Sequence, residues 1–234
     1  SLKTLYTLGG TKGNLVLGGD DILSRWYKKS ECTEYTDVLS NGLKYAVIQL
    51  HHWVEMYSNS YIEFYKNLAR FLNQLIDSKK IDRIYFLPFS YFKGVDYECG
   101  RRLRTFMEDR EEYVVLEPTK DYIFMRELIA NAELVIASRY HPIVFGLGEQ
   151  VPTLGICVND LYKQKISGAF EVVDVDVNSN MIDINEFTYE RLDNWNKKNE
   201  VNSTIIRDNN RDIIKEYNTK RHRSIVEFID RTCK

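Results

Sequence analysis

From residue 44 onward, two kinds of hydrophobic spacing alternate along the chain. Short, nearly continuous apolar runs bounded by polar or turn residues are typical of strands that are covered on both faces of a sheet. Such runs lie at 44–50, 81–89, 112–118, 133–138 and 152–158, with an optional sixth at 171–177. The pattern therefore predicts a sheet of five or six strands.

The segments between these runs carry apolar residues at the spacing of an amphipathic helix. In segment 61–77, Phe64, Leu68 and Leu75 fall on one helical face. Asp121 favours a helix N-cap, and Pro142 suits the first position of a helix. Further helices are predicted at 97–110, 121–132, 142–149 and near 161–170.

Strands that alternate with helices of this length predict parallel β-α-β units. We therefore expect a doubly wound, mostly parallel α/β sheet with flanking helices, Rossmann-like in class, over residues 43–183. Residues 184–234 are polar and periodic, and they predict a helical C-terminal extension. Within it, segment 197–204 is a candidate linker or solvated turn.

Residues 1–42 do not fit this domain comfortably. Segment 10–26 offers one strand, a pair of glycines and two aspartates. A single strand cannot bury its own faces. The segment either adds to the sheet that follows or is the end of a preceding domain with a linker, and we favour the second interpretation.

Composition excludes several classes of protein. The hydrophobic share of 44% is enough for a core, and the net charge of -2 argues against nucleic-acid binding. The four cysteines are far apart and form no metal-binding pattern, so a reducing, cytoplasmic compartment fits best. No apolar run approaches the roughly 18 residues that a membrane-spanning helix needs.

The chain ends its fourth predicted strand on an unusual group of side chains, Ser138, Arg139, Tyr140 and His141. Ligands of open parallel sheets bind beyond the carboxyl ends of the strands. A guanidinium suits phosphate or carboxylate, the N–H groups of a following helix add to an anion site, and histidine titrates near neutral pH. A second interpretation stays open, in which Arg139 pairs with a nearby acid and His141 caps the helix.

Residues 133–168 resemble the signature of the polysaccharide pyruvyl transferase family, in which a strand leads into Arg-x-His, a helix, a glycine, Val-Pro and another strand. Residues 159–168 are similar to the family's Tyr-and-Lys segment. Residues 14–23, with Asp20 and Asp21, are similar to the stretch that ends the family's first domain. The resemblance implies two Rossmann-like domains arranged as in GT-B glycosyltransferases, with this chain as the second and an N-terminal domain missing.

The resemblance implies transfer of a pyruvyl group from phosphoenolpyruvate to two hydroxyls of a saccharide, with formation of a ketal. The acceptor would be a cell-surface saccharide or its lipid-linked oligosaccharide precursor, as in exopolysaccharide and cell-envelope biosynthesis. Phosphoenolpyruvate would be a donor substrate, no cofactor is implied, and no group of residues demands a metal. The basic cluster 219–223 is interpreted as a solvated helix face, and a peripheral contact with the phosphates of a lipid-linked acceptor or with the inner face of the membrane is the alternative.

The family's roles can be carried over to matching positions only. By resemblance, Arg139 and His141 form the catalytic pair that binds phosphoenolpyruvate, with His141 a candidate proton donor. Lys163 or Lys165 could hold the phosphate, although lysines on a polar helix are often simply solvated. Ser138 precedes this pair at the strand end and is included as a substrate contact.

Two positions depart from the family pattern. Tyr140 stands where the family usually has leucine, so its hydroxyl makes an extra ligand contact or only covers the sheet edge. The first strand ends on His51 and His52, where the family often has arginine, so either one histidine takes over the anion contact with the substrate or the donor differs. Adjacent side chains of an extended chain point in opposite directions, so at most one histidine is expected to face the site. Packing or capping remains the alternative for each.

Ser90 and Glu117, with Thr119, follow the second and third strands and should line the same edge. They are candidate ligand contacts, with strand termination by Pro88 and Pro118 as the alternative role of these loops. Two other functions stay open for the whole chain. One is a GT-B glycosyltransferase domain that binds a nucleotide sugar, and the other is a Rossmann-like domain that binds without turnover.

Overall fold

The computed structural model describes residues 38–39, 42–92, 94–199 and 219. The expectation of a preceding domain and linker over 1–42 falls almost wholly outside the described residues. So do the second half of the helical extension and, apart from Thr219, the basic cluster 219–223.

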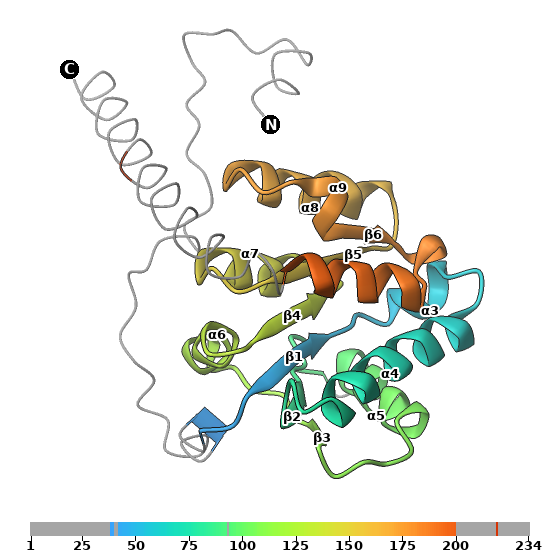
Figure 1. Cartoon of the computed structure of the whole chain (residues 1–234). Coiled ribbons are helices and arrows are strands. Elements are labelled where there is room, and N and C mark those ends of the chain that lie inside the picture. Colours follow the sequence, from blue (N-terminus) through green and yellow to red (C-terminus); the bar gives the residue numbers. More distant parts are fainter. Residues whose placement is uncertain (1–37, 40–41, 93, 200–218, 220–234) are drawn as a thin grey trace, which may run out of the picture.

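The described residues form one sheet in which all six strands are parallel (Figure 1). The strand order is β3-β2-β1-β4-β5-β6, so β1 lies between β2 and β4. The direction of winding reverses between β1 and β4, which makes the gap between their carboxyl ends the switch point of the fold. The predicted doubly wound sheet is confirmed. The strands are β1 (Tyr45–Gln49), β2 (Arg83–Phe86), β3 (Tyr113–Val115), β4 (Leu134–Ala137), β5 (Thr153–Cys157) and β6 (Met181–Asp183).

The helices connect the strands in the expected order. Helix α4 (Tyr61–Asp77) has the predicted bounds, and the Asp121 side chain accepts a hydrogen bond from the Phe124 N–H (2.9 Å), as an N-cap should. A helical segment also covers 189–199. The remaining helices are α3 (Trp53–Tyr57), α5 (Asp96–Phe106), α6 (Tyr122–Ala130), α7 (Tyr140–Gly148), α8 (Asp160–Val172), α9 (Val177–Asn180) and the 3₁₀ helix η4 (Ile184–Glu186).

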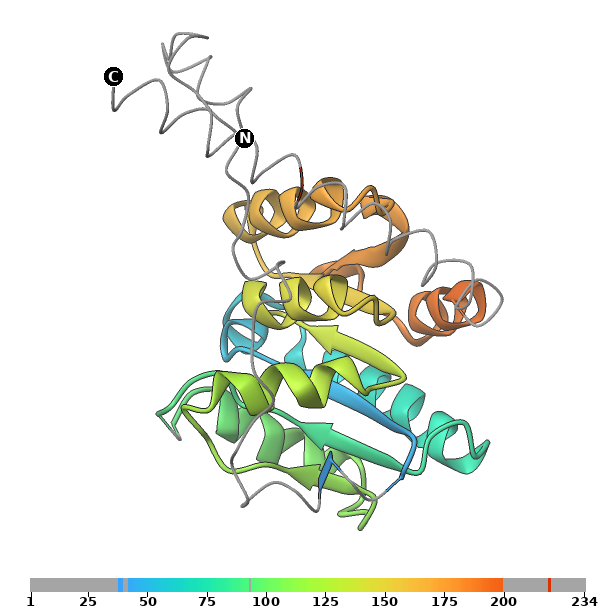
Figure 2. The ribbon, with the colours of Figure 1, turned by 90° about the vertical axis from the view of Figure 1, so that its left-hand side faces the viewer.

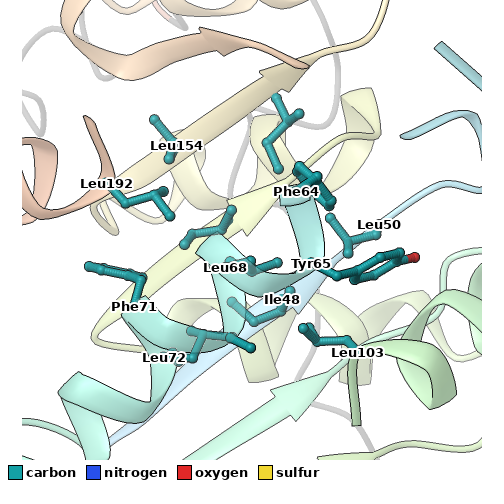
Figure 3. Close-up of a cluster of buried hydrophobic side chains, with 14 of the residues drawn as sticks. Ile48, Leu50, Phe64, Tyr65, Leu68, Phe71, Leu72, Leu103, Leu154 and Leu192 are labelled. Carbon is teal, nitrogen blue, oxygen red and sulfur yellow. The ribbon is translucent and has the colours of Figure 1, made fainter. Parts of the chain in front are cut away.

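Helices cover both faces of the sheet, which explains why the strands are apolar on both sides. On β1, Ile48 packs with the cluster of α4, α5 and residues 187–195, whereas Val47 packs with that of α6, α7 and α8. Figure 2 shows the second of these two layers, with α6 and α7 in front of the sheet. Figure 3 shows Leu68 of α4 over Ile48, with Leu192 beside it, so segment 184–195 contributes to the same core.

Two local predictions were wrong. The sixth strand is not at 171–177, because Ile166, Phe170 and Val173 continue one buried helical stripe that carries α8 to Val172. The strand lies later, as β6. Helix α7 begins at Tyr140 with Arg139 as its N-cap, so Pro142 is the third helical residue. A first-turn N–H has no intrahelical acceptor, so proline costs little there too.

Helix α7 lies very close to β5. A Cβ atom on Gly146 would collide with Oγ1 of Thr153, and a Cβ on Gly155 would lie 2.8 Å from the Ile166 side chain of α8. The Thr153 hydroxyl cannot easily move, because it donates to the Val151 carbonyl (2.8 Å). The absence of a side chain at these two glycines therefore allows the close contacts of β5 with α7 and α8.

We therefore expect Gly146→Ala to lower the free energy of unfolding by about 1–3 kcal/mol, because the added methyl overpacks this contact. Urea unfolding measures the loss. In a Thr153→Ala background the cost should fall by more than half. Gly168→Ala in α8 is the control: apart from the adjacent backbone of its own helix, no atom of the described residues lies within 4 Å of the new methyl, so the change should be neutral or stabilising. Equal losses at both glycines would contradict the packing explanation.

Candidate active site at the carboxyl ends of the strands

The loops that leave β1 and β4 are tied to each other at the switch point. The Arg139 N–H donates to Oε1 of Gln49 (2.9 Å), and the Ser138 N–H donates to the Gln49 carbonyl (3.1 Å). In return the His51 N–H donates to Oγ of Ser138 (2.7 Å). Gln49 and Ser138 are fully buried, so their polar groups serve mainly to hold these loops.

A buried carboxylate brings in a third loop. Asp96, the first residue of α5, is fully buried, and its Oδ2 accepts hydrogen bonds from the Phe89 and Ser90 N–H groups (3.0 and 3.1 Å). The same oxygen accepts from Nε2 of Gln49 (3.1 Å). Asp96 therefore joins the segments that follow β1, β2 and β4.

Arg139 forms a bidentate ion pair with this carboxylate. Its Nε donates to Oδ2 and its Nη2 to Oδ1 of Asp96, each at 2.7 Å, while 24% of its side chain remains exposed. Within the described part of the chain, Nη1 makes no hydrogen bond. The expected pairing with a nearby acid is therefore present, and it also fixes the plane of the guanidinium at the rim. The charge of Asp96 offsets that of Arg139 locally.

His51 lies directly beside this pair and is 6% exposed. Its Nδ1 accepts a hydrogen bond from the Trp53 N–H (3.0 Å), so the neutral ring carries its proton on Nε2. Burial, and then the positive charge of Arg139, lower the pKa of His51 to about 4, with Asp96 acting in the opposite sense. At neutral pH, His51 is an N–H donor and not a cation.

His52 lies against His51, with ring centroids 4.2 Å apart. The expectation that the two rings point in opposite directions was wrong, because His52 has helical φ and ψ angles (-55° and -16°) as the N-cap of α3. Its Nδ1 is buried and has no hydrogen-bond partner among the described residues. The two rings therefore lie together after β1, whereas at most one of them was expected to face the site.

Arg139, Asp96 and His51 form the centre of the candidate site, and the other predicted site residues lie around it with different degrees of burial. His141, the second residue of α7, is exposed and contacts the Tyr140 ring (5.7 Å between centroids). Ser90 contributes its backbone N–H to Asp96, and its Oγ accepts from the Phe92 N–H (3.3 Å). Glu117 accepts from the Tyr97 hydroxyl (3.0 Å) on the β3 side. No hydrogen bond or ring contact joins His141 to Arg139 or His51 in the described part of the chain.

On the β5 side, Lys163 and Lys165 are exposed on the first turns of α8. Lys165 Nζ lies 6.0 Å from the centroid of the Tyr162 ring. That ring contacts Trp53 (5.2 Å), which in turn contacts His51 (4.7 Å). A series of aromatic contacts therefore links the lysine-bearing turn to the end of β1.

Sequence reasoning missed two residues of the centre, Gln49 and Asp96. Gln49 had a usable signal, since a polar side chain inside an otherwise apolar strand must find a buried partner. Asp96 had none, because it lies 43 positions from Arg139 in the chain and only the fold brings them together.

The lowered pKa of His51 makes stability depend on pH. Between about pH 4 and 6.5 the unfolded chain binds the proton and the folded chain does not, so stability falls as the pH is lowered through this window. We expect His51→Asn, whose Oδ1 can still accept from Trp53, to reduce that loss by about 1–2 kcal/mol. Urea unfolding at pH 7, 5.5 and 4.5 measures it. Parallel curves for variant and wild type would contradict the assignment.

A parallel sheet whose order reverses at a switch point, with helices on both faces, defines a Rossmann-like α/β domain. The model of the family "Polysaccharide pyruvyl transferase" matches residues 1–159, more than half of the chain. The chain therefore belongs to the polysaccharide pyruvyl transferase family. No curated protein matches it.

The chain is also similar in fold to solved UDP-GlcNAc 2-epimerases. A protein named as UDP-N-acetylglucosamine 2-epimerase from Listeria monocytogenes has a TM-score of 0.58 at 12% identity, over 91% of this chain and 51% of the other. S. aureus MnaA with UDP gives 0.57 at 10% identity, over 88% and 50%. The Methanocaldococcus jannaschii enzyme with UDP-GlcNAc and UDP gives 0.54 at 15%, over 84% and 51%. The chain thus spans about half the length of these structures.

Proposed function

We propose that this chain is the donor-binding half of a pyruvyl transferase. The donor is phosphoenolpyruvate, and the acceptor is a cell-surface saccharide or its lipid-linked precursor, which receives the pyruvyl group as a ketal. The observation that carries the proposal is the guanidinium of Arg139, fixed by Asp96 beside the neutral His51 at the switch point. Such an edge is where ligands of open α/β sheets bind.

The donor carries a phosphate and a carboxylate close together, and the site offers matching groups. The remaining N–H groups of Arg139 suit one anionic oxygen, and Nε2–H of His51 suits another. The first-turn N–H groups of α7, which begins at Tyr140, add backbone donors. Because Asp96 offsets the charge of Arg139, the phosphate needs further positive charge, and the exposed Lys163 and Lys165 of α8 are candidates to supply it.

In the proposed reaction, His141 gives a proton to the methylene carbon of phosphoenolpyruvate, which becomes the methyl group of the product. One acceptor hydroxyl adds to the central carbon and loses its proton to a base. A second hydroxyl then replaces the phosphate on the same carbon, and its proton leaves with the phosphate. Phosphoenolpyruvate and the diol thus become the ketal and inorganic phosphate. The exposed position of His141 allows a donor to reach it.

The test is a comparison of ligands by isothermal titration and thermal shift, on the full chain. Phosphoenolpyruvate should bind and raise the melting temperature, whereas pyruvate, which lacks the phosphate, should bind much more weakly. With acceptor glycans, the complete enzyme should release phosphate and form an acid-labile ketal. Absence of any phosphoenolpyruvate binding would overturn the proposal.

A nucleotide sugar is the second candidate ligand. The aromatic contacts from His51 through Trp53 to Tyr162 could accept a base, and two of the solved structures of similar fold contain UDP. Stabilisation by UDP but not by phosphoenolpyruvate would favour a GT-B-type glycosyltransferase function. If Arg139→Ala leaves the cellular glycans unchanged, the domain binds without turnover.

The proposed place of action is the cytoplasm, at the inner face of the membrane where lipid-linked precursors are found. In the portion of the chain that the structure describes, no helix has the length and apolar character needed to cross a bilayer.

A further inference from the structure

The exposed apolar side chains of the described residues are all at one edge of the molecule. Each of them lies on a segment just after a strand or at the start of the next helix. These positions are at the carboxyl edge of the sheet, which also carries Arg139. They are Met56, Tyr57, Tyr61, Ile62, Tyr91, Phe92, Tyr122 and Leu161. Exposed apolar groups that gather beside a candidate site mark a surface that contacts something.

Three of these side chains are aromatic and lie on the loops after β2 and β3 or at the start of the helix that follows β3. Tyr91, Phe92 and Tyr122 are 57%, 74% and 63% exposed, and the centroids of the Tyr91 and Phe92 rings lie 6.3 Å apart. Lys120 holds its Nζ 4.3 Å from the centroid of the Tyr91 ring, which links the loop after β3 to the loop after β2. The exposed aliphatic residues lie on other elements.

This group is anchored to the candidate active site. The backbone N–H groups of Phe89 and Ser90, directly before Tyr91, donate to the Asp96 oxygen that also binds Nε of Arg139. The Phe92 N–H then donates to Oγ of Ser90 (3.3 Å). The Tyr91 and Phe92 rings therefore project from a backbone that is held by Asp96, the partner of Arg139.

We propose that Tyr91, Phe92 and Tyr122 are an aromatic platform that binds a pyranose ring of the acceptor saccharide, an inference that rests on the proposed function. A pyranose has an apolar face of C–H groups and a rim of hydroxyls. Aromatic rings pack against the face, while the phenol hydroxyls and the Lys120 ammonium can bind the rim. Tyr91 and Phe92 are on the loop whose backbone binds Asp96, the partner of Arg139. A pyranose on this platform would therefore have its hydroxyls close to the bound phosphoenolpyruvate.

The experiment is saturation-transfer NMR on the full chain with methyl β-D-glucopyranoside and methyl β-D-galactopyranoside as probes. Wild type should transfer saturation to the ring protons of at least one glycoside. Tyr91→Ser, Phe92→Ser and Tyr122→Ser should each lower that signal at least threefold, and the triple variant should abolish it. Ile62→Ser, at a similarly exposed residue of α4, is the control and should keep the signal. Melting curves verify that all variants remain folded.

The same samples are titrated with phosphoenolpyruvate, which separates the two proposals. If the donor does not bind but glycoside binding depends on the platform, the proposed function fails and the platform stands. If the donor binds and the triple variant retains the glycoside signal, only the platform is overturned. The platform proposal is also overturned if the wild-type protein gives no glycoside signal. It is likewise overturned if the wild-type protein self-associates and the triple variant does not, because the aromatic residues would then form a contact between copies of the chain.

Discussion

Asp96→Ala is expected to destabilise the protein by about 3–5 kcal/mol, because it leaves the charge of Arg139 without its partner in a half-buried site. It also removes the acceptor of the Phe89 and Ser90 N–H groups and of the Gln49 amide. Buried donors without an acceptor add to the cost. The loss is measured as the free energy of unfolding in urea.

The matched control for this change lies on the same helix. Glu98 of α5 pairs with Arg101 three residues later, but both side chains are about half exposed or more (48% and 64%). Glu98→Ala should therefore cost less than about 1 kcal/mol. If Asp96→Ala cost no more than Glu98→Ala, the Asp96 carboxylate would not be what holds the three loops together.

Arg139→Lys is expected to weaken phosphoenolpyruvate binding by about 10–100-fold, which corresponds to the loss of a hydrogen bond between charged groups. Lysine keeps the positive charge but cannot contact both oxygens of Asp96 and a ligand in one plane. Isothermal titration measures the affinity. Folding should suffer less than in Asp96→Ala, because the buried carboxylate retains its three other hydrogen-bond donors.

The control for this variant is Arg101→Lys, an exposed arginine of α5. It should bind phosphoenolpyruvate as wild type does. If Arg139→Lys also binds within twofold of wild type, Arg139 is a structural partner of Asp96 only, and the donor site lies elsewhere. The unfolding curve of the same variant distinguishes these roles, because a purely structural arginine changes stability without changing affinity.

The ion pair between Arg139 and Asp96 reduces the net positive charge that this edge of the sheet can offer to an anion. A solitary arginine would supply a full positive charge, whereas Arg139 supplies geometry and hydrogen-bond donors with much of its charge offset by Asp96. His51 adds no charge at neutral pH, because burial and Arg139 lower its pKa. If phosphoenolpyruvate binds here as proposed, further cations are required to hold its phosphate, and Lys163 and Lys165 of α8 are candidates.

The sequence by itself determined the architecture. Apolar runs of the kind that are covered on both faces, with amphipathic helices between them, predict the parallel, doubly wound sheet that is observed, and α4 has the bounds that its spacing predicts. The sequence also determined that Arg139 and His141 lie at the end of β4. These features depend on residues close together in the chain, where periodicity and capping preferences act directly.

Only the tertiary structure decided which groups meet at that end. Asp96 reaches Arg139 from another loop, and the helical turn at His52 brings two rings together that an extended chain would separate. It also decided that residues 171–172 complete α8, because burial of Phe170 favoured helix over strand. Contacts between distant segments, and the conformation of a loop after a strand, depend on packing that local sequence does not encode.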